Sequence, residues 1–209
     1  MDPSQLAAAT FDRCAPEYQT KYMNVEQYAE GLQRLCSHLP AQARVLELGC
    51  GPGNLTQYLL RWQPQYRILG IDVAPKMLAL AAANNPGAEF HLLDCRSISQ
   101  LTSRFDAVVG GFCLPYLSKP EAQQLIADSA SLLEPGGMLY LSTMEDDYMK
   151  SGMQTSSAGH SLYIHYHQAD YLLAALATHG FSLLHCQRQP FPDAENPSAT
   201  DLILLAQRQ

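Results

Sequence analysis

The sequence is poor in positive charge. Only 13 of its 209 residues are Lys or Arg, against 20 Asp or Glu, so the formal net charge at pH 7 is -7. Surfaces that bind DNA or RNA are usually basic, and anionic membranes attract basic segments. This charge balance argues against a nucleic-acid partner and against binding to an anionic membrane.

Long apolar runs are missing as well. No stretch approaches the ~20 apolar residues that a helix needs to span a bilayer. The first residues, MDPSQL, show neither the cationic flank nor the apolar core of a signal peptide. We therefore expect a cytoplasmic protein without a membrane partner.

The six cysteines lack the spacing of a zinc or redox site. No two of them form a C-x-x-C pair. A chain of this length can bury a substantial core without disulfide staples. We therefore expect scattered, reduced and mostly buried thiols.

What the sequence does contain is a glycine-rich turn between an apolar strand and an amphipathic helix. The apolar run 44–48 is followed by Gly49, Gly51 and Gly53, and apolar residues then recur at helical spacing over 55–62. Without a Cβ, the turn lets a ligand approach the backbone, and the helix amides beyond it favour negative charge. The pattern predicts a strand, a tight turn and a helix around a nucleotide-like ligand.

The spacing of the glycines narrows the choice of ligand. A dinucleotide fingerprint reads G-x-G-x-x-G, whereas this turn reads G-x-G-x-G and has Asn54 in the place of the third glycine. An acidic residue, Glu47, stands two positions before the first glycine. These residues resemble the first motif of the class I S-adenosylmethionine (SAM) dependent methyltransferases. The resemblance implies that SAM is the cofactor, S-adenosylhomocysteine the product, and that four residues of the motif bind it: Glu47, Gly49, Gly51 and Gly53.

The second predicted strand ends at Asp72. This residue lies 19 positions after Gly53, where a carboxylate can accept both hydroxyls of a ribose. It could instead cap the next helix, since Pro75 suits a first helical turn, but the preceding glycine loop favours the ribose role. The resemblance places Val73 and Met77 against the adenine ring, with ordinary core packing as the alternative.

The next two predicted strands also end in residues that the resemblance assigns to SAM. After the third strand, Asp94 would accept the adenine amino group and Cys95 would supply a backbone amide, unless Asp94 is only a turn residue. After the fourth strand, Gly110 and Gly111 would let the backbone approach the methionyl amine. Phe112 would wall the methyl-transfer site.

Tyr116 would form a second wall of that site and contact the acceptor. The motif Asn/Asp-Pro-Pro-Tyr/Phe/Trp, found in many methyltransferases that act on amide or exocyclic base nitrogens, is missing at this point. Its lack argues against adenine, cytosine or glutamine as the acceptor. We expect a small-molecule acceptor, and the aromatic walls favour an apolar or aromatic one.

Residues 1–40 are predicted to form N-terminal helices and a lid. The segment 11–23 is rich in aromatic residues, and the resemblance implies that it folds over the cofactor. Aromatic faces attract cations such as the SAM sulfonium, so Tyr22 is a candidate to border the methionine end. Alternatively, Tyr18 and Tyr22 only pack this segment onto the sheet.

Residues 145–167 form the least regular part of the chain. Such a long connection is usually functional or disordered, and it leaves the carboxyl end of the fifth strand, where ligands bind in open α/β sheets. We assign it to the acceptor site. If 162–167 is extended, Tyr163, His165 and His167 share one face.

Each of these three residues receives a predicted role. Tyr163 is a candidate for binding the acceptor, and His165 and His167 are candidates for taking its proton, because a neutral imidazole suits that role near pH 7. They could equally belong to a polar loop that caps the next helix. An H-x-H pair can also bind a metal, but no third or fourth ligand is evident, so no metal site is expected.

The order of elements predicts a single α/β domain over 1–209. Strands and helices alternate, and the chain closes with strands at 181–189 and 201–206 around a proline-rich turn. We predict a doubly wound, mostly parallel seven-stranded sheet with helices on both faces, ending in an antiparallel strand of a C-terminal hairpin. This is a Rossmann-like fold.

The predicted activity is transfer of a methyl group from SAM to a nucleophile on an acceptor. Two alternatives stay open. An NAD(P)-dependent oxidoreductase would also use the glycines and Asp72, and a SAM-binding regulatory protein would bind the cofactor without catalysis.

Overall fold

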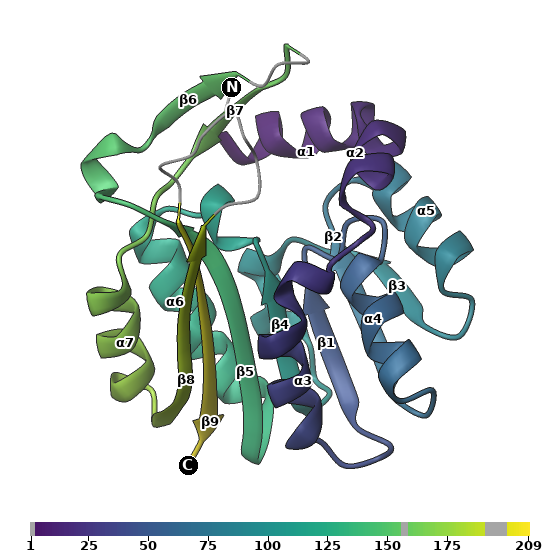
Figure 1. The fold of residues 1–209 in the computed structure, drawn as a ribbon, viewed down its shortest axis with the longest axis vertical. Helices are drawn as coiled ribbons and strands as arrows, with labels where there is room; N and C mark the ends of the chain where they lie inside the picture. Colours follow the sequence, from purple (N-terminus) through teal and green to yellow (C-terminus); the bar gives the residue numbers. More distant parts are fainter. Residues whose placement is uncertain (1–2, 156–158, 191–199) are drawn as a thin grey trace.

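A computed structural model describes residues 3–155, 159–190 and 200–209. Residues 156–158 of the predicted acceptor loop and most of the predicted proline-rich turn lie outside this description. At the centre is a seven-stranded sheet in the order β3-β2-β1-β4-β5-β9-β8 (Figure 1). Its strands are β1 Arg44–Leu48, β2 Arg67–Asp72, β3 Glu89–Leu92, β4 Phe105–Gly111, β5 Leu133–Glu145, β8 Phe181–Pro190 and β9 Thr200–Arg208.

The direction of the strands confirms the predicted fold class. Strands β1 to β5 are parallel, β9 runs antiparallel to β5, and β8 runs antiparallel to β9. We expected the antiparallel strand at the end of the sheet. Instead, β9 lies between β5 and β8. Burial explains the order, because residues 201–206 are buried throughout while most of β8 is exposed or half-buried, so β9 suits the inner position.

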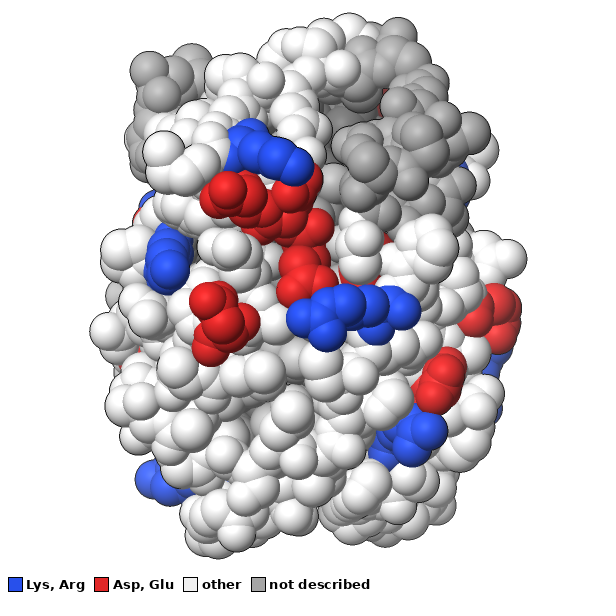
Figure 2. Space-filling view, turned by 60° about the vertical axis from the view of Figure 1, so that its left-hand side comes forward, with Lys and Arg blue, Asp and Glu red and all other residues white. Residues whose placement is uncertain are grey.

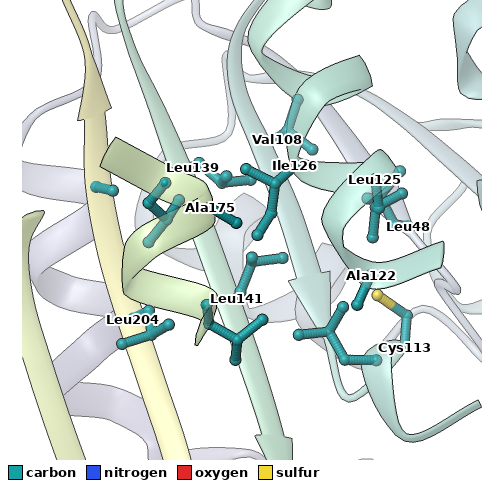
Figure 3. Close-up of a cluster of buried hydrophobic side chains, with 14 of the residues drawn as sticks. Leu48, Val108, Cys113, Ala122, Leu125, Ile126, Leu139, Leu141, Ala175 and Leu204 are labelled. Carbon is teal, nitrogen blue, oxygen red and sulfur yellow. The ribbon is translucent and has the colours of Figure 1, made fainter. Parts of the chain in front are cut away.

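Helices cover both faces of the sheet. They are α1 Pro3–Arg13, α2 Ala15–Tyr22, α3 Ala29–Ser37, α4 Asn54–Trp62, α5 Pro75–Asn84, α6 Lys119–Leu132 and α7 Ala169–Thr178, with a short 3-10 helix η1, Glu26–Tyr28, before α3. On one face α6 and α7 pack against the leucines and valines of the central strands (Figure 3). On the other face α3 and α4 form a second apolar layer with β1 and β4.

Local sequence signals account for where several helices begin. Ser118 and Glu121 form the predicted capping box ahead of α6, with the Ser118 amide donating to the Glu121 carboxylate at 2.7 Å. Pro75 occupies the first turn of α5, where its missing N–H costs nothing. None of the helices described is long and apolar enough to cross a membrane.

The predicted irregular segment 145–167 contains structure of its own. Two short strands, β6 Gly152–Thr155 and β7 Ser161–Ile164, form a separate antiparallel pair. In Figure 1 this pair stands beside α1, above the carboxyl ends of the parallel strands, where α1 and α2 also lie. The expected extended run to residue 167 ends at Ile164, so the two histidines that follow are not part of a strand.

Charges of both signs mix on the molecular surface. On the face shown in Figure 2, acidic and basic side chains lie next to one another within a mostly uncharged surface. Ion pairs of this kind link Lys150 to Asp146 and Arg188 to Glu145. Among the described residues of that face the cations therefore do not gather into a broad basic patch.

Candidate functional site

Two adjoining cavities lie at the carboxyl end of the parallel strands. The first cavity encloses about 110 Å³ and the second about 360 Å³. Ligands of open α/β sheets bind at this edge. The cavities share a wall that consists of Phe11, Tyr18, Gly49, Gly51, Gly111, Phe112 and Tyr116.

The glycine turn forms the floor between the cavities. Gly49 and Gly51 line both of them and have φ values of 61° and 51°, which residues with a Cβ rarely adopt. Gly53 also has a positive φ but lines neither cavity. A Cβ there would meet Asn85 and Ala81 of the α5 region, so Gly53 allows α4 and α5 to pack closely rather than facing a ligand.

Asp72 holds the glycine turn and the residue ahead of α5, although the N-cap of that helix is Ala74 and not Asp72. Its Oδ2 accepts a hydrogen bond from the Gly51 amide and its Oδ1 one from the Ala74 amide, both at 2.9 Å. Burial raises the pKa of Asp72, while these amide hydrogen bonds act to lower it. Asp72 lines the first cavity, and each oxygen retains a lone pair, so the carboxylate that holds the turn can also accept two ligand hydroxyls.

Glu47 is a buried acid at the base of the second cavity. Only 1% of the residue is exposed, and the Thr56 hydroxyl donates a hydrogen bond to its Oε2. Burial raises the pKa of Glu47 to about 8, so the carboxyl is largely protonated at neutral pH. A ligand cation placed near it would favour the ionised form.

The far end of the first cavity holds the residues predicted to contact adenine. Val73, Met77, Asp94 and Cys95 all line it. Sequence analysis missed Arg96, whose Nη2 lies 2.6 Å from Asp94 Oδ2. The signal for this pair in the sequence is an Arg two positions after an Asp that follows a strand.

This ion pair changes what Asp94 can do. Burial alone would raise its pKa, but hydrogen bonds from the Arg96 side chain and amide hold the pKa below the usual value. Asp94 is therefore ionised, and Arg96 fixes its orientation while also reaching Glu121 at 3.1 Å. An adenine amino group that donated a hydrogen bond to Asp94 would share the carboxylate with Arg96.

At the end of β4 two neighbouring glycines, both predicted to let the backbone approach the cofactor, have different surroundings. Gly110, predicted to approach the cofactor, lines neither cavity, and a Cβ there would lie 2.9 Å from the Leu141 side chain. Gly111 lines both cavities instead. Alternation along the strand explains the difference, because residue 110 faces Leu141 on one side of the sheet and residue 111 faces Leu55, which lines the second cavity, on the other.

Phe112 holds an unusual backbone conformation at the junction of the cavities. Its φ of 55° is the only positive value among the described non-glycine residues. Its amide donates to the Ser142 carbonyl at 3.2 Å and to the Ser142 hydroxyl at 3.1 Å, which stabilises the turn. Strain of this kind concentrates at functional sites, and here it places the ring against both cavities.

Residues of the N-terminal helices α1 and α2 line both cavities. The Tyr18 and Tyr22 rings lie 4.6 Å apart, and Phe11 contacts Tyr116 at 5.0 Å between ring centres. Tyr22 and Tyr116 both line the second cavity. Asn54, noted in the sequence only as a departure from the dinucleotide motif, donates from Nδ2 to the Tyr22 carbonyl at 2.9 Å and ties α2 to the glycine turn.

The histidine hypothesis needs correction. His167 is fully buried, with Nε2 2.8 Å from the Leu114 carbonyl and Nδ1 hydrogen-bonded to the Tyr171 hydroxyl. Burial lowers its pKa to about 4. His165 Nδ1 lies 3.3 Å from the Tyr148 hydroxyl. Both nitrogens of His167 are engaged within the protein, so it has none to offer an acceptor.

Tyr163, His165 and His167 do gather, but away from the cavities. The Tyr163 and His165 rings lie 4.7 Å apart, and none of the three residues lines either cavity. From the same segment His160 and Leu162 line the second cavity instead. The alternation over residues 162–167 predicted that the odd-numbered residues face the ligand, whereas even-numbered residues of this segment line the cavity. A shift of one residue reverses which face meets the ligand.

The second cavity has further walls that sequence analysis passed over. Tyr28 of η1 and Tyr140, Ser142 and Met144 of β5 line it. The Tyr28 hydroxyl donates to Asp201 of β9 at 2.9 Å. Each of these residues sits in an apolar pattern typical of core packing, so no local signal marked them.

Known proteins resemble this chain in sequence and in structure. Residues 45–137 match the family model of a methyltransferase domain. Over 146 residues the chain is 30% identical to the malonyl-[acyl-carrier protein] O-methyltransferase of Enterobacter lignolyticus, covering 68% of this chain and 55% of the relative. Over 101 residues it is 40% identical to the trans-aconitate 2-methyltransferase of Methylobacterium nodulans, covering 48% of this chain and 38% of the relative. The chain thus spans about half the length of these curated relatives or less.

A solved structure extends the likeness over the whole chain. The magnesium protoporphyrin IX methyltransferase of Synechocystis PCC 6803, crystallised with SAM, superposes with a TM-score of 0.76 at 18% identity. The match covers 100% of this chain and 98% of that one. At this identity the likeness concerns the fold.

Proposed function

Because this chain carries a methyltransferase domain of the class I, Rossmann-like type, we propose that it is an enzyme that transfers a methyl group from SAM to a small-molecule acceptor. The observation that carries the proposal is the pair of cavities that meet at Phe112 and Tyr116. One cavity would hold a nucleoside and the other a second molecule. Two substrates that meet at a shared wall are what group transfer requires.

The first cavity would hold the adenosine of SAM. Asp72 would accept the ribose hydroxyls through the lone pairs that the turn leaves open, and Val73 and Met77 would contact the adenine ring. Cys95 would offer its amide to the ring. In the absence of a Cβ at Gly49 and Gly51, the chain of SAM would pass over the turn toward the second cavity.

The methionine end would then lie between Glu47, Tyr22 and Phe112. Its ammonium would favour the ionised form of Glu47, whose pKa burial raises to about 8, and aromatic faces near the sulfonium would stabilise its charge. SAM supplies an already activated methyl group. The protein's share is to hold the nucleophile in line with it, which can contribute up to roughly 7–11 kcal/mol.

The acceptor would occupy the second cavity. Aromatic walls, Tyr28, Tyr116 and Tyr140 among them, support a small and partly apolar molecule. The curated relatives are named for trans-aconitate, a small molecule, and for a malonyl group on an acyl-carrier protein, and neither name points to a nucleic-acid acceptor. A single domain over 1–209 and a cytoplasmic location stay predictions, the latter supported by six unpaired cysteines among the described residues.

The test is calorimetric titration of the purified protein with SAM, S-adenosylhomocysteine and NAD. We expect binding of the first two in the roughly micromolar range and no binding of NAD. Binding of NAD alone would overturn the proposal in favour of an oxidoreductase. Release of S-adenosylhomocysteine in the presence of an acceptor separates an enzyme from a regulatory SAM-binding protein.

A further inference from the structure

A buried carboxylate lies behind the wall of the second cavity. Asp201, near the start of β9, is fully buried, and the Tyr28 hydroxyl donates a 2.9 Å hydrogen bond to its Oδ2. The other oxygen, Oδ1, has no hydrogen-bond partner among the described residues. Buried polar atoms are nearly always paired, so an open lone pair at this place needs an explanation.

The register of the sheet places this carboxylate beside the site. Asp201 pairs with Met144 across the β5–β9 ladder, so it lies on the same face of the sheet as Met144 and Ser142. Met144, Ser142 and Tyr28 all line the second cavity. The Tyr28 ring also lies 5.1 Å from the ring of Phe112, at the junction of the cavities. Tyr28 therefore stands between the carboxylate and the space for the acceptor.

Resting on the proposed methyl transfer, we propose that Tyr28 and Asp201 form a proton-accepting pair that activates the acceptor. The proton of the Tyr28 hydroxyl points to Asp201, and the Gln27 side chain also hydrogen-bonds this hydroxyl, so one lone pair of its oxygen is left for the cavity. A protic group of the acceptor can donate to that oxygen. Tyr28 is then the catalytic residue, and Asp201 positions and polarises it.

The transfer balances without any further reactant. The electron pair of the acceptor atom forms the new bond to the methyl carbon, and the bond between that carbon and sulfur breaks, which returns its electrons to sulfur as a neutral thioether. The acceptor's proton passes to Tyr28 as the Tyr28 proton passes to Asp201. When the product leaves, the proton returns through Tyr28 to water.

The pair defines a class of acceptor. A hydroxyl, thiol or ammonium group must lose a proton when it is methylated, and the pair provides a place for it. A carboxylate carries no proton at neutral pH and would meet the negative charge of Asp201. We therefore infer a protic acceptor rather than a carboxylate.

The surroundings keep the pair in the state that this role needs. Burial raises the pKa of Asp201 to about 6, and the Tyr28 hydrogen bond acts to lower it. Burial and the Asp201 charge raise the pKa of Tyr28 well above its ordinary value. The same two causes raise the pKa of Tyr140 of β5. The neighbouring Glu145 is neutralised by Arg188 at 2.9 Å. Asp201 is therefore ionised and Tyr28 protonated above about pH 6.

The first experiment needs no acceptor. The carboxyl carbon of Asp201 is followed by 13C NMR through a pH titration of the wild-type protein and of Tyr28→Phe. We expect titration near pH 6 in the wild type and at higher pH in the variant, because the variant lacks the hydrogen bond that stabilises the charge. Identical titration in both proteins would overturn the pair.

The second experiment measures turnover. Release of S-adenosylhomocysteine is screened with matched aromatic compounds that differ in the reacting group: phenols, thiophenols and benzylamines against benzoates. We expect turnover with protic members and none with benzoates. With the best acceptor, Tyr28→Phe and Asp201→Asn should each lower kcat by roughly 100-fold, remove the acid limb of the pH profile, and leave SAM affinity within twofold. The double variant should be no worse than either single one.

A matched control separates this role from lost packing. Tyr58 is a buried tyrosine that lines neither cavity, and its hydroxyl accepts a 3.4 Å hydrogen bond from Gln33. Tyr58→Phe should keep turnover and the acid limb. If Tyr28→Phe behaves like this control, or loses SAM affinity and turnover together, the pair has no catalytic role.

The outcomes also distinguish the pair from the proposed function. Turnover with benzoates alone overturns the pair and leaves the methyltransferase activity standing. Binding of SAM without turnover on any member of the panel overturns both, and leaves a cofactor-binding protein. Failure to bind SAM would overturn the proposed function itself.

Discussion

The two cavities share a wall but are built in different ways. The first cavity is lined largely by residues at the ends of β1 to β4, and its polar groups include backbone amides, Asp72 and the Asp94–Arg96 pair. The second cavity is lined mainly by residues of η1, the N-terminal helices α1 and α2, and β5, together with His160 and Leu162 at β7. The difference teaches that a local motif can specify a cofactor site, whereas the acceptor site depends on contacts between distant segments.

The largest effect should come from His167, which is fully buried and lines neither cavity. His167→Ala leaves the Leu114 carbonyl and the Tyr171 hydroxyl without their buried partner and opens a cavity, at a cost of roughly 3 kcal/mol in the free energy of unfolding. Chemical denaturation measures it. The half-buried His165 provides the control, and His165→Ala should cost less than about 1 kcal/mol.

The same variant tests whether His167 lies outside the acceptor site. Because the folded-state pKa of His167 is lowered to about 4, the unfolded state binds more protons, and wild-type stability is lost as the pH falls from about 6.5 to 4. His167→Ala should weaken this dependence. A stable variant that loses turnover alone would return His167 to the acceptor site.

Filling the second cavity should impair acceptor binding and leave the first cavity unaffected. Met144→Trp adds bulk to the β5 wall without touching Asp72 or the glycine turn, and should displace the acceptor. A displacement of about 1 Å can cost roughly 100-fold in turnover. We expect that loss in kcat/KM with SAM affinity within twofold by calorimetry. Equal losses in both quantities would show that the cavities act as one.

The converse change removes the polar anchor of the first cavity. Asp72→Ala deletes the acceptor of the Gly51 and Ala74 amides and of the ribose hydroxyls, and should weaken SAM binding by at least tenfold, which is about 1.4 kcal/mol. Titration calorimetry measures it. As a matched control, Asp106→Ala changes another half-buried strand acid that lines neither cavity. Unchanged SAM affinity in a folded Asp72→Ala protein would contradict the assignment.

A last prediction concerns Glu47 and the pH dependence of the ligand-free protein. Its folded-state pKa, raised to about 8 by burial, means that the folded state holds a proton that the unfolded state releases above about pH 4.5. This group therefore removes stability as the pH rises from about 4.5 to 8, opposite in sign to His167. Glu47→Gln should flatten that decline in a thermal-melt series. An unchanged slope would mean that Glu47 is ionised in the fold.

The contrast between the cavities also explains what could be predicted from sequence. The strand Arg44–Leu48, the positive-φ glycines and the strand-end Asp72 are dictated by neighbours in the chain, and the structure places them as expected. Sequence spacing could not assign Gly53 and Gly110, because both face other elements rather than a ligand. Their surroundings depend on how α5 and β5 pack, which is a long-range property.

The acceptor site was harder because its residues look like core. Tyr28, Tyr140 and Met144 follow apolar patterns, and Asp201 opens a strand that is otherwise buried and apolar. Residue type singles out the two histidines, yet neither lines a cavity, and His167 is buried with both ring nitrogens hydrogen-bonded. Residue type indicates possible chemistry, while exposure to a cavity decides whether that chemistry is available.

The insertion of β9 between β5 and β8 has a consequence for the order in which the protein can form on the ribosome. Every strand end that lines the first cavity lies before residue 118 and can pair soon after synthesis. The edge of β5 must wait for residues 200–208, which follow all other strands in the chain. Loop closure over this distance is slow. The strands around the first cavity can therefore pair before β9 covers the edge of β5.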